Sequence, residues 1–325
     1  MAVTGDFLHD LYNAGMTSQP KKDRRTARLL AEQRLTEKRN AASKNLDRMT
    51  AREIVRLMNR EDRNVARAVG RESAAIAGAV DAIVGAIRKG GRLIYVGAGS
   101  SGRMGVLDAA ECPPTFGISP KLVVALIAGG RRAITRAVEG AEDSERNGAR
   151  DLRAKKLTRR DVVVGIAASG TTPYVVGSLK YARARGAMTV AVTSNLRMPV
   201  GRVAKIVIAP EVGPEVLTGS TRLKAGTSQK MVLNMLSTGV MARLGHVYEN
   251  LMIDMLLTNE KLAERAVRIL VEASGASVSA AEQALRAGGH DLRVGLVMLK
   301  RRVGAGEAKR LIARAGGDLR WALGE

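Results

Sequence analysis

The chain has 325 residues, 46% of them hydrophobic, which is long and apolar enough for a full folded core. Its formal net charge is +22, but aromatic residues make up only 2% and the basic residues are dispersed, so we expect no nucleic-acid partner, while an anionic metabolite would benefit from the same field. With one cysteine, three scattered histidines and no apolar run of roughly 18 residues, we expect no disulfide framework, no metal site, no membrane partner and a cytoplasmic location.

The first elements of the chain are expected to be a basic extension followed by two helices. Residues 1–35 are basic and polar without clear periodicity, and we interpret them as an N-terminal extension. Thr50-Ala51-Arg52-Glu53 has the spacing of a capping box and predicts the start of a helix. Small and apolar residues at helical spacing predict a second helix from about Val65 to Lys89, ending at the Gly90-Gly91 pair.

Five short apolar runs then follow at regular intervals, separated mostly by stretches long enough for helices. Continuous Val, Ile and Leu content is typical of strands buried on both faces, and the alternation predicts an α/β fold with a doubly wound five-stranded parallel sheet. Ligands of such sheets bind at the carboxyl ends of the strands. The predicted strands are Leu93–Val96, Leu122–Ala128, Asp161–Ala167, Thr189–Thr193 and Lys205–Ala209.

The region after the sheet is expected to be helical. Thr227 or Ser228 could cap a long helix that runs through Leu244 and is apolar on most faces, as in a buried or subunit-interface helix. From about residue 259, three or four short amphipathic helices are predicted, separated by Gly275 and two Gly-Gly pairs. We therefore divide the chain into the extension (1–35), a ligand-binding domain with flanking helices (36–258) and a small C-terminal helical domain (259–325).

Three loops of this sequence are rich in small hydroxyl residues. Gly97-Ala98-Gly99-Ser100-Ser101-Gly102 matches neither the dinucleotide fingerprint nor a Walker A loop. Ser169-Gly170-Thr171-Thr172-Pro173 also leads from strand to helix, with proline at a plausible first helical position, and the segment 219–227 adds hydroxyls and two cations. Any one loop could be a simple cap, but three in one domain favour binding of a phosphorylated small molecule.

Carboxylates follow two of the predicted strands. Glu111 comes shortly after the first loop, in a segment stiffened by Pro113 and Pro114, and an acid beside a phosphate cradle suggests chemistry on a phosphosugar. Glu142 and Asp143 follow the second strand and a short helix, also on the ligand-bearing side. The alternative is that these two residues only favour the N-terminus of the next helix.

Longer stretches of the sequence resemble one enzyme family, the N-acetylmuramic acid 6-phosphate etherases of the sugar isomerase (SIS) domain superfamily. The resemblance covers roughly residue 36 to the end and leaves the first 35 residues outside. The matching stretches are Leu-Asp-Ala-Ala-Glu-Cys-Pro-Pro-Thr (107–115), Leu-Ile-Ala-Gly-Gly (126–130), Ala-Val-Glu-Gly-Ala-Glu-Asp-Ser (137–144), Val-Val-Val-Gly-Ile-Ala-Ala-Ser-Gly (162–170), Gly-Ser-Thr-Arg-Leu-Lys-Ala-Gly-Thr (219–227) and Thr-Asn-Glu-Lys-Leu (258–262).

This resemblance implies a SIS-type fold and removal of the D-lactyl ether from N-acetylmuramic acid 6-phosphate by elimination and then addition of water, without a cofactor. It implies that Glu111 is the acid that protonates the departing lactate and that Glu142 is the base at C2. It also implies a homodimer. The residues expected to bind the substrate are Ser100, Ser101, Ser169 and Thr172 at the phosphate, with Thr221 and Lys224 as weaker candidates.

One position departs from the family pattern. The family usually has Ala-Ser-Gly-Arg-Thr-Pro, whereas this chain has Thr171 in place of the arginine, so a cation is missing beside the expected phosphate loop; Arg103 is a candidate to compensate. Three alternatives to an etherase remain open at this point: a non-catalytic phosphosugar sensor, an aldose–ketose phosphate isomerase, and a nucleic-acid-binding protein. A sensor would keep the phosphate loops but would not need both acids.

Overall fold

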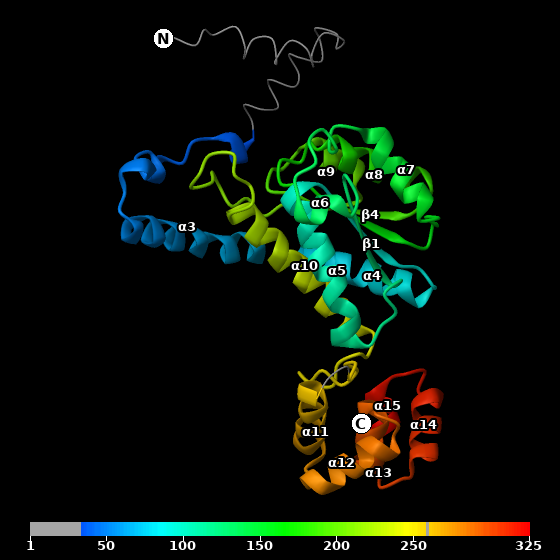
Figure 1. The fold of residues 1–325 in the computed structure, drawn as a ribbon. Helices are drawn as coiled ribbons and strands as arrows, with labels where there is room; N and C mark the ends of the chain where they lie inside the picture. Colours follow the sequence, from blue (N-terminus) through cyan, green and yellow to red (C-terminus); the bar gives the residue numbers. More distant parts are fainter. Residues whose placement is uncertain (1–33, 258–259) are drawn as a thin grey trace, which may run out of the picture.

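The protein is built on one five-stranded parallel sheet with the strand order β2-β1-β3-β4-β5 (Figure 1). The structure is a computed structural model that describes residues 34–257 and 260–325. Each predicted strand is confirmed, with bounds that differ by no more than one residue at every end. The strands are β1 Leu93–Gly97, β2 Val123–Ile127, β3 Val162–Ile166, β4 Met188–Val192 and β5 Ile206–Ile208.

The register aligns the carboxyl ends of the three strands on which the candidate site depends. Gly97 at the end of β1 is paired with Ile127 of β2 and with Ile166 of β3. The loops that follow these strands therefore leave the sheet at the same edge. Since β1 lies between β2 and β3, the chain reverses its direction of winding at the β1/β3 boundary.

Helices cover both faces of the sheet, because alternate strand residues point to opposite sides. Leu93 and Tyr95 belong to one hydrophobic cluster, and Ile94 and Val96 belong to the other. The first cluster is completed by α3 Ala51–Arg71, α4 Ser73–Arg88, α5 Gly99–Phe116 and α10 Lys224–Arg243. The second is completed by α7 Glu145–Ala154, α8 Pro173–Ala184 and α9 Pro199–Val203; α6 Arg132–Thr135 is a single turn after β2.

The helices before the sheet begin as predicted but divide at a different residue. The capping box at Thr50 and Glu53 is present and starts α3. The predicted helix from Val65 is wrong at its start, since residues 65–71 belong to α3 and the break falls at Glu72. The Glu72 carboxylate accepts a hydrogen bond from the backbone N–H of Ala209 (3.0 Å), which follows β5. The residue at which the helix breaks therefore contacts a residue that is distant in sequence. Before α3 lie three short 3-10 turns, η1 Leu35–Glu37, η2 Ala41–Ser43 and η3 Leu46–Arg48.

The long helix after the sheet starts earlier than predicted and is capped by another residue. α10 begins at Lys224, and Thr227 and Ser228 lie inside it. The buried Glu215 carboxylate accepts hydrogen bonds from the N–H groups of Lys224 (3.0 Å) and Ala225 (2.9 Å). A carboxylate outside the helix therefore satisfies the first N–H groups, which is the role expected of a serine or threonine cap.

The C-terminal region has its own hydrophobic cluster, which extends from Tyr248 to Leu323. Within the described residues it contains five helices instead of the predicted three or four. The predicted glycine breaks are present, but the sequence analysis missed the break at Arg302–Gly304, where Arg302 adopts a left-handed conformation with φ 55°. The helices are α11 Glu260–Ser274, α12 Val278–Ala287, α13 Leu292–Arg301, α14 Ala305–Arg314 and α15 Leu319–Leu323.

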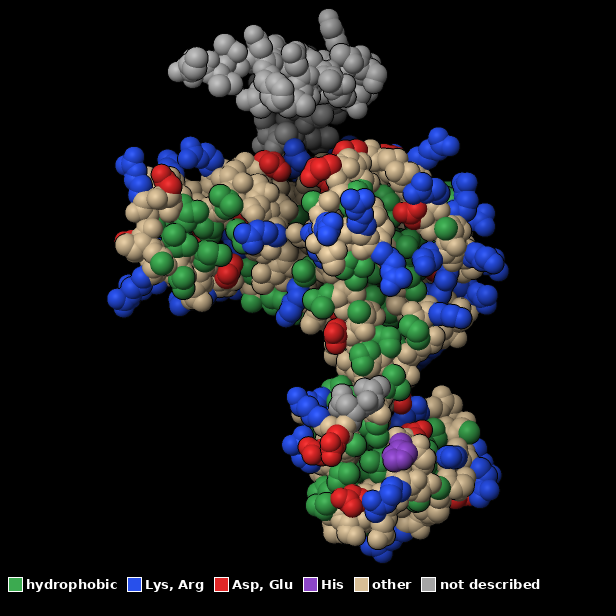
Figure 2. Space-filling view, in the orientation of Figure 1, with side chains coloured by type: hydrophobic (Ala, Val, Ile, Leu, Met, Phe, Trp, Pro, Cys, Tyr) green, Lys and Arg blue, Asp and Glu red, His purple; other side chains and the backbone are tan. Residues whose placement is uncertain are grey.

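Three sequence-based expectations concern the N-terminus, membrane spans and the surface charge. Residues 1–33 of the expected extension lie outside the described residues. None of the described helices is long and apolar enough to cross a membrane. Lysine and arginine side chains are distributed over the visible face of the sheet-containing region and of the C-terminal helical region, and they do not gather in one tract (Figure 2).

Candidate functional site

The candidate site lies where the chain reverses its winding, at the carboxyl ends of β1 and β3. The helix after β1 begins at Gly99, and the helix after β3 begins at Pro173, which occupies the first helical position as predicted. These two helices belong to opposite faces of the sheet, so their N-termini approach the crevice between the strands from both sides. Their unpaired N–H groups and positive dipole ends make this crevice suited to an anion.

Close packing of backbone fixes the first loop. A Cβ added to Gly102 would lie 2.6 Å from Cγ1 of Ile127 and 2.9 Å from the carbonyl oxygen of Gly97, so only glycine lets α5 start so near the sheet. Ser100 is half-buried and Ser101 is buried in the first turn of α5. The glycine-rich segment is therefore mainly the first turn of a helix, and it presents both predicted hydroxyl residues at the helix N-terminus.

The second loop holds its hydroxyls by contacts among its own residues. The Ser169 hydroxyl oxygen accepts hydrogen bonds from the backbone N–H of Thr171 (3.2 Å) and from its hydroxyl (3.1 Å). Gly170 between them has φ +74°, a left-handed conformation suited to glycine. Thr172 is the N-cap residue of α8 but makes no side-chain capping bond. This half-buried residue therefore has its hydroxyl at the helix N-terminus.

Glu142 is brought to the same place by the segment after β2. Its carbonyl oxygen accepts a hydrogen bond from the N–H of Tyr174 (2.9 Å), which joins it to the first turn of α8. Glu142 also lines a cavity of about 190 Å³ together with Gly99 and Arg103. Although Glu142 is exposed overall, desolvation beside the cavity raises the pKa of its carboxyl above the usual value of 4.5, and the negative charges of Asp143 and Glu139 raise it further. Asp143 lies in the turn before α7, whose N-cap is Ser144.

Glu111 does not lie beside this cavity. The sequence suggested a tight segment next to the first loop, but Glu111 lies inside α5, about 18 Å beyond Gly99 along the helix axis at 1.5 Å per residue. Its side chain is exposed. One turn earlier, Asp108 accepts hydrogen bonds from the hydroxyls of Tyr95 (2.8 Å) and Ser237 (3.0 Å), which fix this part of α5 against β1 and α10. The two candidate acids are therefore well separated within one chain.

The third loop, before α10, contributes a buried ion pair. The Lys224 ammonium is 2.8 Å from the Glu61 carboxylate, and Lys224 is only 2% exposed. Partial burial would raise the pKa of Glu61, but hydrogen bonds from Lys224 and Asn40 bring it below its usual value. Lys224 thus holds α3 against the start of α10. Thr221 is half-buried in the same loop.

Two arginines lie near the loops that the sequence singled out. Arg103 donates hydrogen bonds to the carbonyl oxygens of Ile134 (2.9 Å) and Arg136 (3.2 Å), so its guanidinium holds the segment around α6. Arg34 donates to the hydroxyl oxygen of Thr171 (3.4 Å). The sequence analysis missed Arg34, because no local pattern links it to a residue 137 positions away.

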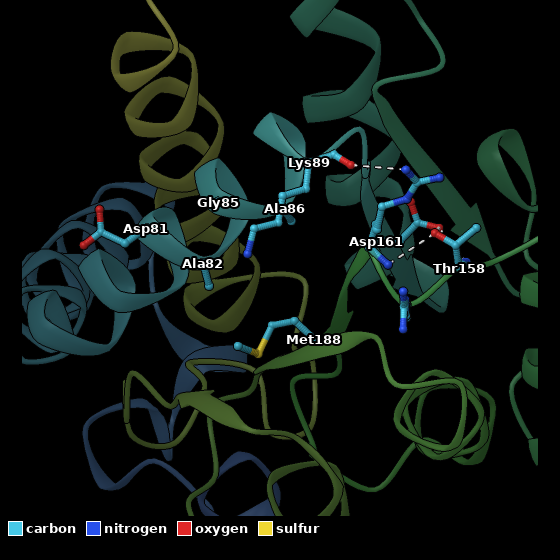
Figure 3. Close-up of a pocket in the computed structure, with 10 residues that line it drawn as sticks. Asp81, Ala82, Gly85, Ala86, Lys89, Thr158, Asp161 and Met188 are labelled. Atoms are coloured by element: carbon cyan, nitrogen blue, oxygen red, sulfur yellow. Dashed lines mark hydrogen bonds between the residues drawn. The ribbon is translucent and has the colours of Figure 1, made fainter.

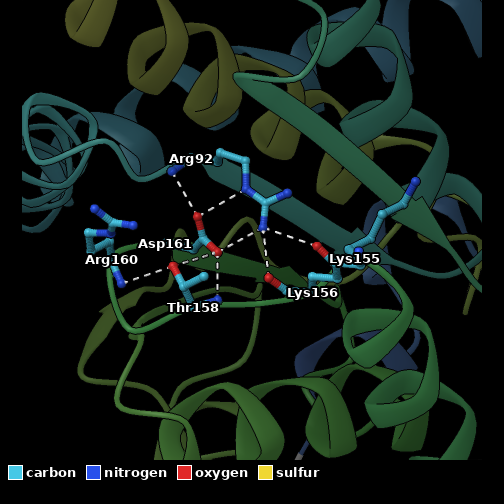
Figure 4. A network of polar contacts seen from close by, with 6 residues as sticks. All are labelled: Arg92, Lys155, Lys156, Thr158, Arg160 and Asp161. Carbon is cyan, nitrogen blue, oxygen red and sulfur yellow. Dashed lines mark hydrogen bonds and ion pairs between the residues drawn. The ribbon is translucent and has the colours of Figure 1, made fainter.

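A larger cavity, of about 900 Å³, lies at the opposite edge of the sheet between α4 and the start of β3 and β4 (Figure 3). The carboxylate at this edge, Asp161, already accepts hydrogen bonds from the backbone and guanidinium of Arg92 and from Thr158 (Figure 4). Partial burial would raise the pKa of Asp161, but its bonds to Arg92 and Thr158 lower it overall. We interpret this network as structural, because its hydrogen bonds are made within the protein. Among the described residues, no group of three or more potential metal ligands was found.

Comparison with known proteins shows which domain and which family the chain is similar to. Residues 136–239 match the SIS domain model, and residues 75–183 match the model of the glucokinase regulatory protein N-terminal SIS domain. Proteins named N-acetylmuramic acid 6-phosphate etherase from Pectobacterium atrosepticum and Clostridium beijerinckii are 51% and 52% identical, each covering 89% of this chain and 95% of their own length. The protein of the same name from Serratia proteamaculans is 53% identical over 89% of this chain and 97% of its own.

Proposed function

Because the chain belongs to the N-acetylmuramic acid 6-phosphate etherase family, we infer that it is an etherase (a carbon–oxygen lyase) that converts N-acetylmuramic acid 6-phosphate to N-acetylglucosamine 6-phosphate and D-lactate. The observation that carries this function is identity above 50% across nearly the whole length of these relatives. A phosphosugar sensor is not favoured, because a sensor has no need of both Glu111 and Glu142. The buried Cys112, whose pKa burial raises to about 12, fits a reducing cytoplasm.

The chemistry assigns a separate task to each carboxylate. In the open-chain aldehyde, the neighbouring carbonyl acidifies the C2 hydrogen, and Glu142 removes it as a proton. The C3–oxygen bond then breaks with formation of a C2=C3 double bond, while Glu111 gives a proton to the departing lactate oxygen. Water adds across the double bond, with its hydroxyl at C3 and a proton at C2. General acid and base steps of this kind contribute about 10²–10⁴-fold each.

The surroundings of Glu142 support its role as the base. Its raised pKa makes it a stronger base than an ordinary glutamate. The 6-phosphate is bound at the N-termini of α5 and α8, by Ser100, Ser101, Ser169 and Thr172 together with backbone N–H groups. Thr221 and Lys224 support the substrate site from the third loop. Lys224 does so by holding α3 against α10.

The distance between the two acids supports a homodimer. Carboxylates that act on neighbouring carbons of one sugar must both come within hydrogen-bond reach of it, yet Glu111 lies about 12 Å along α5 beyond Arg103, the last residue of that helix to line the cavity of Glu142. We propose that each substrate is enclosed by Glu142 of one protomer and Glu111 of its partner. The exposed position of Glu111 is compatible with such an arrangement.

The test is release of lactate from N-acetylmuramic acid 6-phosphate by the purified protein without added metal or nucleotide. Glu111→Ala should abolish release of lactate but retain exchange of the C2 hydrogen with solvent deuterium. Glu142→Ala should lose both, and normal exchange in this variant would remove Glu142 as the base. Glu211→Gln, a change at an exposed carboxylate after β5, serves as the matched control. Absence of release by the wild-type protein, with phosphosugar binding retained, would favour the sensor.

A further inference from the structure

We propose that Arg34 binds the substrate phosphate at the N-terminus of α8. It would thus supply the positive charge that is missing because position 171 is threonine instead of arginine. The inference rests on the proposed function, since it concerns the phosphate of the same substrate. The arginine comes from the segment before α3, far in sequence from the strand-to-helix loop that it joins.

Among the described residues, the Arg34 guanidinium makes few contacts. Its Nη1 lies 3.4 Å from Oγ1 of Thr171 and 3.8 Å from Oε1 of Glu37. Its Nε is buried and has no hydrogen-bond partner within residues 34–257 and 260–325. A guanidinium has five N–H donors, and a buried donor without a partner is costly. An anion with several acceptor oxygens, placed beside Thr171, would satisfy these donors.

The backbone around Arg34 is held firmly at this position. The N–H of Leu35 donates to Oδ1 of Asn195 (2.7 Å), and Nδ2 of Asn195 donates to Oγ1 of Thr36 (3.3 Å) and to the carbonyl oxygen of Ala168 (2.8 Å). Thr36 and Asn195 are 0% and 2% exposed. Asn195 follows β4 and Ala168 follows β3, so the ligand-bearing edge of the sheet itself fixes the segment that carries the arginine.

The position of Thr171 completes the argument. Its hydroxyl links Arg34 to Ser169, so the cation, two hydroxyls and the α8 N-terminus lie in one connected group. An arginine at 171 would bring its charge from within the loop, whereas here the charge comes from outside the loop. Arg103 does not fill this role, because its guanidinium is bonded to carbonyl oxygens around α6. The planar guanidinium suits phosphate because it can donate two parallel hydrogen bonds.

The experiment compares Arg34→Met with Lys38→Ala, which removes an exposed cation four residues later. We measure the dissociation constant for N-acetylglucosamine 6-phosphate by calorimetry and the KM for release of lactate. A charge-assisted hydrogen bond to phosphate predicts about 10- to 100-fold weaker binding and a higher KM for Arg34→Met. Lys38→Ala should change neither quantity by more than about twofold, as an exposed, screened charge.

A second variant separates phosphate binding from a purely structural role. Arg34→Met combined with Thr171→Arg should recover affinity to within a few-fold of the wild-type protein, because the guanidinium returns by the other route. If Arg34 only holds its segment in place, the double variant will stay as weak as the single one, and the proposal is wrong. Unchanged affinity in Arg34→Met, or no binding of the phosphosugar by the wild-type protein, would also overturn it. If the wild-type protein binds through Arg34 yet releases no lactate, the etherase function fails and the role of Arg34 stands.

Discussion

Two inactive variants should restore activity when they are joined in one dimer. Glu111→Ala and Glu142→Ala each remove one carboxylate, and a protomer with either change lacks one of the two proton-transfer groups. If the acid and the base of a site come from different protomers, a mixed dimer has one site with both carboxylates and one with neither. The structure leads to this arrangement because α5 carries Glu111 about 12 Å beyond Arg103, the last residue of that helix to line the cavity of Glu142.

The expected magnitude follows from counting sites. In a twofold-symmetric dimer, one intact site out of two gives about half of the wild-type activity per mixed dimer. Each single-variant dimer should retain no more than about 1% of wild-type activity, because loss of a general acid or base costs roughly 10²–10⁴-fold. The signal therefore exceeds the background by about fiftyfold or more.

The assay uses co-expression of the two variants with different affinity tags, so that passage over both resins isolates the mixed dimer. Release of lactate from N-acetylmuramic acid 6-phosphate is then measured per dimer. The matched control pairs the wild-type chain with a chain that carries both changes. That dimer should be inactive if the sites are shared, because each of its sites lacks one carboxylate.

Opposite results would refute the reasoning. If both carboxylates act from the same protomer, the dimer of single variants stays inactive and the control dimer keeps about half of the wild-type activity. If passage over both resins recovers no complex that carries both tags, the homodimer itself is contradicted.

Two further predictions concern single residues. Asp143→Asn removes a negative charge that raises the pKa of Glu142, so the acid limb of the pH profile of kcat/KM should move to lower pH, since the base acts only when ionised; an unmoved limb would show that another group titrates there. Asp161→Asn breaks a partly buried ion pair with Arg92 and should reduce the free energy of unfolding near neutral pH by about 1–3 kcal/mol, as measured by urea denaturation. Because the folded-state pKa of Asp161 is lowered, its stabilisation is present above the unfolded-state pKa and is lost as the pH falls through the folded-state value, so wild type and variant should converge in acid.

Local patterns were sufficient to predict the sheet and most of its loops. β1 and β3 are buried on both faces, so their runs of apolar residues stand out from the surrounding sequence. The capping box at Thr50 and the proline that begins α8 are likewise contained within a few residues. These features depend on short-range chemistry, and a single sequence records them directly.

The features that were missed depend on contacts between distant residues. Glu72 ends α3 while bonding to Ala209, and Glu215 caps α10 from outside the helix. Glu111 was expected beside the first loop because it is near it in sequence, but about three turns of the continuous helix α5 separate them in space. The contact of Arg34 with Thr171 has no sequence signature, since either residue alone is compatible with an exposed position.

The hydrogen bond between Leu35 and Asn195 has a consequence for the order in which parts of the molecule fold. It joins residues 160 positions apart, and the neighbouring contact of Arg34 with Thr171 spans 137. Closing such long loops costs entropy that is regained only once the partner surface exists, so these contacts should form after the sheet. The arginine would thus reach the α8 loop late in folding and leave it early in partial unfolding. Loss of phosphate affinity would then precede loss of the fold.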